Sequence, residues 1–193
     1  MKEKNYTFFA FIRNVFTLFL MLLFANFGWG QTAQVLPFSL PDSAKRADLT
    51  AANGWSYTGI GTDYSSSGSN IKFDTTNDFA ILRIASSPGL ISYNLKGNGL
   101  SGAYVFQLSE SADGDVFTLT QSITTGIGTV NTVFQSTLLT STRYIKWTYV
   151  NKATGNIGFG GVQIAAPLNL VPVVSDVEIT GLPNTSVQLM GSY

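Results

Sequence analysis

The feature that most constrains this chain is the regular spacing of its short apolar segments. Segments rich in β-branched and aromatic residues recur every eight to twelve residues, and clusters of Gly, Asn, Ser and Asp separate them. After the first thirty residues, no stretch keeps a helical period of apolar residues for three turns. The pattern is typical of an all-β, antiparallel β-sandwich. The predicted strands are 35–40, 55–60, 70–73, 79–84, 90–96, 104–110, 117–122, 130–138, 144–150 and 157–165.

Alternation within a segment assigns side chains to faces, because successive side chains of a strand point to opposite sides. In 90–96, Ile91, Tyr93 and Leu95 form an apolar row, and 104–110 repeats this pattern. We therefore expect these two strands to line one sheet of the core.

Gly and Asn tolerate positive φ and mark turns. The run 97–99 (GNG) predicts a turn after the first of these strands. The run 111–115 (SADGD) predicts the turn of the next hairpin.

The N-terminus predicts export. Three basic residues precede an apolar run at 15–24 that only Thr17 interrupts, and the small residues Gly28 and Gly30 follow it. This is the pattern of a Sec-type signal peptide over residues 1–30, cleaved after Gly30. The apolar run is short for a membrane span, although an uncleaved N-terminal anchor remains the alternative. We expect a secreted or cell-surface protein with no membrane segment after cleavage.

Composition excludes several kinds of chemistry. The chain has no cysteine and no histidine, which rules out disulfides, thiol nucleophiles, Ser-His-Asp triads and imidazole zinc sites within it. Residues 1–30 hold three basic residues and one acidic residue, so the remainder carries eight basic and ten acidic residues. That balance gives nucleic-acid binding little electrostatic support.

Paired carboxylates remain available for catalysis. Glycosidase chemistry needs only two of them in a cleft. Most of the acidic residues lie in turn contexts, as Asp42 does after Pro41 and Asp63 does in a Gly/Ser-rich loop. Solvated turn carboxylates are the favoured interpretation, and we expect no enzyme activity from this domain.

Several stretches resemble β-jelly-roll modules found at the front of secreted multidomain proteins of Bacteroidetes, which are similar to galactose-binding and carbohydrate-binding modules. The resemblance rests on 71–74 (IKFD), 77–79 (NDF), 91–98 (ISYNLKGN), 110–114 (ESADG), 141–147 (STRYIKW) and 155–158 (GNIG). It implies a jelly-roll sandwich over 31–166. Because such modules accompany many activities, the resemblance implies a fold more firmly than a ligand.

The resemblance also implies a structural calcium ion, although no cofactor is the first expectation. Many relatives carry an acidic or amide residue in the last strand, where this chain reads Phe159-Gly160-Gly161-Val162. Calcium takes six to eight oxygen ligands. Loop carboxylates are the remaining candidate ligands, namely Asp42, Asp48, Asp74 and Asp78, with Asp63 as a further source.

Exposed aromatic rings stack on sugars in binding modules of this kind, and polar side chains bond the hydroxyls. The candidate ligand-binding residues are Trp55, Tyr57, Tyr64 and Arg143. Trp55 and Tyr57 share a face by alternation, whereas Tyr64 lies in a polar loop where we expect it to be exposed. Trp147 lies between Ile145 and Tyr149 and is predicted to be core.

The C-terminal stretch predicts a second domain. Prolines punctuate a linker at 167–173, and the run 174–193 resembles the first strands of an immunoglobulin-like repeat. Two strands cannot bury a core alone. We therefore expect the chain to be part of a longer exported protein.

Three functions stay open at this point. The first is a noncatalytic module that binds carbohydrate or a cell-surface ligand and tethers downstream domains. The second is a structural spacer or adhesin domain without a small ligand. The third is a fragment of a secreted hydrolase.

Overall fold

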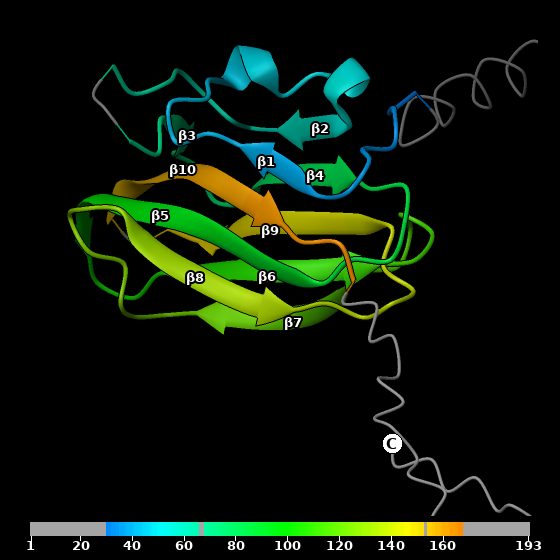
Figure 1. The fold of residues 1–193 in the computed structure, drawn as a ribbon. Coiled ribbons are helices and arrows are strands. Elements are labelled where there is room, and N and C mark those ends of the chain that lie inside the picture. The colour runs from blue at the N-terminus through cyan, green and yellow to red at the C-terminus, as the bar shows by residue number, and fades with distance from the viewer. Residues whose placement is uncertain (1–29, 66–67, 153, 168–193) are drawn as a thin grey trace, which may run out of the picture.

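The structure is a computed structural model that describes residues 30–65, 68–152 and 154–167. Within these residues, ten strands form two five-stranded antiparallel sheets that lie face to face (Figure 1). The predicted β-sandwich is confirmed. The predicted signal peptide up to residue 29, the predicted linker from residue 168 and the predicted immunoglobulin-like stretch 174–193 lie outside the described residues. No helix in the described part is long and apolar enough to cross a membrane.

The first sheet has the strand order β1-β10-β5-β8, and β3 also pairs with β10. Its strands are β1 (Phe38–Leu40), β10 (Thr154–Ile164), β5 (Leu90–Ser101), β8 (Thr132–Thr137) and β3 (Ile71–Phe73).

The second sheet has the strand order β2-β4-β9-β6-β7. Its strands are β2 (Trp55–Thr58), β4 (Asp78–Arg83), β9 (Tyr144–Asn151), β6 (Val105–Ser111) and β7 (Thr118–Ile123). Two single turns of 3₁₀ helix, η1 (Arg46–Asp48) and η2 (Ala51–Asn53), connect β1 to β2. From β3 onward the chain crosses between the sheets in the order of a jelly roll.

Two predictions about the middle of the chain are wrong. The run 97–99 is not a turn, because β5 continues to Ser101 and its Gly97 pairs with Ile157 of β10. The strands β5 and β6 also lie in different sheets. The hairpin predicted around 111–115 is confirmed, since β6 pairs with β7.

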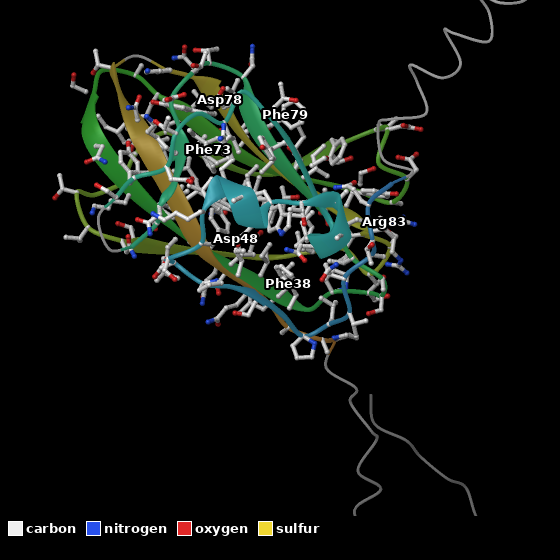
Figure 2. The ribbon with its side chains drawn as sticks, turned by 90° about the horizontal axis from the view of Figure 1, so that it is seen from above. Phe38, Asp48, Phe73, Asp78, Phe79 and Arg83 are labelled. Atoms are coloured by element: carbon white, nitrogen blue, oxygen red, sulfur yellow. The ribbon has the colours of Figure 1, made fainter. Side chains whose placement is uncertain are left out.

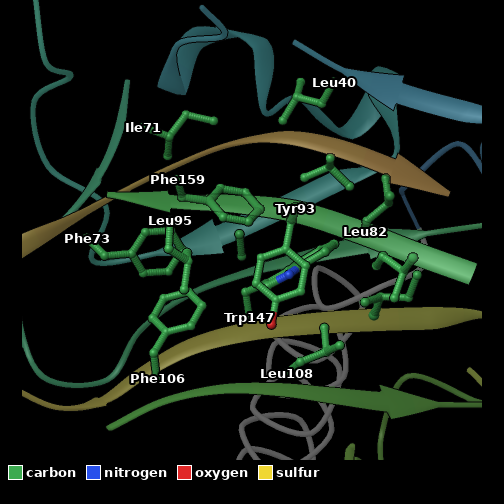
Figure 3. Close-up of a cluster of buried hydrophobic side chains, with 14 of the residues drawn as sticks. Leu40, Ile71, Phe73, Leu82, Tyr93, Leu95, Phe106, Leu108, Trp147 and Phe159 are labelled. Atoms are coloured by element: carbon green, nitrogen blue, oxygen red, sulfur yellow. The ribbon is translucent and has the colours of Figure 1, made fainter. Parts of the chain in front are cut away.

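The core lies between the sheets and is built by alternation. Along β4, β6, β5 as far as Leu95 and β9 as far as Tyr149, every second side chain is buried. Aromatic rings from both sheets meet at the centre (Figure 3). The ring centroid of Phe159 lies 5.2 Å from that of Trp147 and 5.6 Å from that of Phe73. Tilted and edge-on pairs at such distances are favourable.

Candidate functional site

Trp55 and Tyr57, two of the predicted ligand contacts, differ in burial. Trp55 is only 1% exposed and packs 5.5 Å from Trp147. The prediction that Trp55 contacts a ligand is therefore wrong, because its strand turns this side chain into the core. Trp147 is buried as predicted. Tyr57 follows on the same face of β2 but is 38% exposed, since β2 is an edge strand of the second sheet.

Tyr64 and Arg143 hold loops in place. Tyr64 is half-buried, and its hydroxyl is buried without a hydrogen-bond partner in the described part of the chain, so the expectation that Tyr64 is exposed is wrong. The Tyr64 N–H donates to the carbonyl of Asn70 at 2.8 Å. Arg143 Nη1 donates to the carbonyls of Thr140 and Thr142 at 3.1 and 2.6 Å. The guanidinium is thus used within its own turn.

Each of the four predicted calcium ligands has partners of its own. The contacts are Asp42 with Asn94 Nδ2 (2.9 Å), Asp48 with the Lys45 N–H (2.8 Å), Asp74 with Lys72 Nζ (3.1 Å) and Asp78 with the Thr75 N–H (2.7 Å). Across the described ranges, no three acidic side chains gather where they could hold a metal ion. Within the described ranges these four carboxylates do not converge on one calcium position, and each already accepts from an N–H group or a lysine through at least one of its oxygens.

The glycines of the last strand have a packing role instead. A Cβ at Gly161 would lie 2.6 Å from Asp42 Oδ1, and one at Gly158 would lie 2.3 Å from the carbonyl oxygen of Ser69. Loop residues therefore rest directly on the outer surface of β10. Larger side chains there would displace these loops from the first sheet.

Beyond these loops, the outer face of the first sheet is open and forms a groove. A single register row crosses four strands, with Ser39 opposite Gln163, Gln163 opposite Ser92, and Ser92 opposite Gln135. The groove has a volume of about 430 Å³. Its lining is Pro37, Phe38, Ser39, Leu90, Ser92, Gln135, Gln163, Ile164 and Ala165.

The chemistry of this groove is polar and uncharged. Its amide and hydroxyl groups can both donate and accept hydrogen bonds, while the exposed residues Leu90, Pro37 and Ala165 supply apolar surface. Sequence reasoning missed this site. Alternation does place Ser92 on the outer face of its strand, but the strands that pair with it are far apart in the sequence.

Comparison with known protein families finds no match, and comparison with curated proteins finds none either. Solved structures do resemble the chain. A cleaved adhesin domain of Lys-gingipain has 14% sequence identity and a TM-score of 0.51, over 68% of this chain and 98% of that domain. Another cleaved adhesin domain of Lys-gingipain, from Porphyromonas gingivalis, has 10% identity and a TM-score of 0.51, over 66% of this chain and 96% of its own length.

The chain shares their β-sandwich fold. A family 29 carbohydrate-binding module in complex with mannohexaose also matches, with 13% identity and a TM-score of 0.46 over 67% of this chain and 90% of the module.

The hydrolase alternative would need two free carboxylates in one cleft. A smaller cavity of about 220 Å³ does contain Glu110 and Asp113. Both oxygens of Glu110 already accept hydrogen bonds, from Thr120 Oγ1, Thr142 Oγ1 and the Leu139 N–H. Backbone N–H groups of its own turn lower the pKa of Asp113. Neither carboxyl is placed as a proton donor to a substrate, which general acid catalysis requires.

Proposed function

We propose that this β-sandwich is a noncatalytic binding module whose ligand is an uncharged glycan lying in the groove over β1, β10, β5 and β8. The row Ser39, Gln163, Ser92 and Gln135 carries the proposal, because four strands present amide and hydroxyl groups to one space. Sugar hydroxyls are matched by groups that donate and accept. A volume of about 430 Å³ is in the range of small-ligand clefts.

The lining of the groove disfavours a charged ligand. Its lining holds no Asp, Glu, Lys or Arg side chain. An ionic ligand would lose part of its hydration and meet no opposite charge in return. A neutral oligosaccharide loses only hydrogen bonds to water, which the glutamines and serines replace.

The test is a screen of the purified protein on an array of neutral glycans, with and without calcium, followed by titration calorimetry of the best ligand. Each lost hydrogen bond is worth about 1 kcal/mol, so Gln135→Ala or Gln163→Ala should weaken binding by about threefold to tenfold. Gln107→Ala is the matched control, since Gln107 lies on β6 in the second sheet.

Two outcomes would count against this function. If no neutral glycan binds in either condition, a structural spacer becomes the better hypothesis. If a glycan binds but both groove variants bind it as tightly as Gln107→Ala does, the ligand lies elsewhere on the protein. Secretion and attachment to downstream domains remain predictions from the sequence.

A further inference from the structure

The outer face of the second sheet has a different character from the groove. A register row crosses it from β4 to β7, in which Ile81 lies opposite Lys146, Lys146 opposite Ser109, and Ser109 opposite Leu119. Two phenylalanines flank this row. We call Phe79, Ile81, Phe117, Leu119 and Lys146 the aromatic-cationic face. In the view from above, Phe79 lies on the side of the molecule away from Phe38 of the first sheet (Figure 2).

Lys146 lies between the two phenylalanine rings. Its Nζ is 4.4 Å from the ring centroid of Phe79 and 5.3 Å from that of Phe117. Cations are attracted to the faces of aromatic rings at these distances. The rings also remove water from the ammonium, and this burial lowers the pKa of Lys146.

No acidic side chain within the described ranges forms an ion pair with Lys146, whereas Lys72 and Asp74 do pair. The nearby turn holds Asp113 and Asp115, but Asp113 accepts hydrogen bonds from backbone N–H groups of that same turn. A second cation stands on the same sheet, since the guanidinium of Arg83 lies 5.7 Å from the ring centroid of Tyr144. The face therefore carries positive charge that its own carboxylates leave unpaired.

The rings are accessible as well as apolar. Phe79, Ile81 and Phe117 are half-buried, and Leu119 is 52% exposed. A ligand that suits both features has a flat apolar surface beside an anionic group. A pyranose with a carboxylate meets this requirement, because its C–H face can lie on a ring while the carboxylate reaches the ammonium. A small inorganic anion would use Lys146 and leave the rings uncovered.

We propose that the aromatic-cationic face is a second glycan site, which binds an acidic polysaccharide through stacking on Phe79 and Phe117 and a charge-assisted hydrogen bond from Lys146. The assignment to a sugar rests on the proposed function of the module. The two sites lie on opposite outer faces of the sandwich, so either can fail without the other.

The experiment is titration of the purified protein with a short oligogalacturonide and with the same oligosaccharide after methyl esterification of its carboxylates. Hydrogen bonds to charged groups are the strong ones, so Lys146→Gln should weaken binding of the acid about tenfold or more. The methyl ester should bind the unaltered protein correspondingly weakly. Phe79→Ala should also weaken binding several-fold. Lys96→Gln is the matched control, because Lys96 lies on β5 of the other sheet.

A second readout distinguishes contact from a structural effect. Binding of an anion favours the charged ammonium, so the oligogalacturonide should raise the pKa of Lys146. NMR of the Lys146 side chain at a series of pH values measures this pKa with and without the ligand. The proposal is overturned if the acid does not bind, if Lys146→Gln or the methyl ester binds as tightly, or if the pKa stays constant on binding. It is also overturned if a polyglutamate peptide binds as well through Lys146, because the occupant would then be an acidic protein.

The groove variants separate the two sites. Gln135→Ala should retain binding of the acid, and Lys146→Gln should retain binding of the neutral ligand. If the unaltered protein binds the oligogalacturonide but no neutral glycan, the proposed groove is refuted and the aromatic-cationic face stands. Loss of both ligands in Lys146→Gln would refute an independent second site.

Discussion

Substitution of Phe159 should destabilise the protein more than most single changes, because this ring joins the two sheets. Phe159 has no exposed surface, and besides Trp147 and Phe73 its ring meets Tyr93 at a centroid distance of 6.4 Å. Phe→Ala changes in cores cost about 3–5 kcal/mol, since transfer energy is lost and a cavity remains. Domains of this size unfold with about 5–15 kcal/mol in total. Phe159→Ala should thus remove a large fraction of the stability.

Urea unfolding followed by tryptophan fluorescence measures this loss, since Trp55 and Trp147 are both in the core. With a urea dependence of about 2 kcal/mol per molar, the midpoint should fall by roughly 2 M. Val116→Ala is the control, because Val116 is 73% exposed and such changes stay within about 0.5 kcal/mol. If Phe159→Ala shifted the midpoint no more than this control does, the aromatic cluster would not be the packed core described above.

Two further substitutions test the loops. Gly158→Ala would place a Cβ 2.3 Å from the Ser69 carbonyl oxygen, so the melting temperature should fall by an amount equivalent to about 1–3 kcal/mol; an unchanged melting temperature would mean that the loop does not rest on β10. Burial raises the pKa of the Asp78 carboxyl above its ordinary value of 3.8, so the folded state binds more protons than the unfolded state there. Stability should fall as the pH rises from about 4 towards neutrality, and Asp78→Asn should lose this decline. Urea unfolding midpoints measured across that pH range compare the unaltered protein with Asp78→Asn. If the two midpoints changed with pH in parallel, the pKa of Asp78 would not be raised in the folded state.

The sequence predicted the strands well because alternation is a local signal. Each of the ten predicted segments overlaps an observed strand, and the buried rows of β5 and β6 are the predicted ones. Alternation gives the face of a side chain but not the sheet to which its strand belongs. For this reason alternation alone predicts one sheet for β5 and β6, although they belong to different sheets.

The run 97–99 shows how a distant strand overrides a local preference. Gly and Asn favour a turn, but β10 supplies pairing partners for Gly97 and Asn98 from about sixty residues further along the chain. Sheet formation depends on such context more strongly than helix formation does. The same limit explains the groove, whose row becomes visible only when the register of four separate strands is known.

Residues of the candidate sites illustrate a further limit. Alternation puts Lys146 and Trp147 on opposite faces of β9, but only the structure brings Phe79 and Phe117 close to the ammonium of Lys146. Trp55 and Tyr57 share a face as predicted, yet one is core and the other is partly exposed, since burial also depends on position along the strand.

The two outer faces follow from one requirement, namely that both sheets use their inner faces for the aromatic core. The outer face of the first sheet then presents a row of Ser and Gln side chains. The part of this face that the loops leave uncovered is the uncharged groove. The second sheet keeps half-buried aromatic rings outside, together with an ammonium that forms no ion pair within the described part of the chain. Because charge decides which ligand is favoured on each face, neutral and acidic glycans should bind with separate salt dependences. Only binding at the aromatic-cationic face should weaken measurably as salt rises, since only that site includes a charge pair that salt can screen.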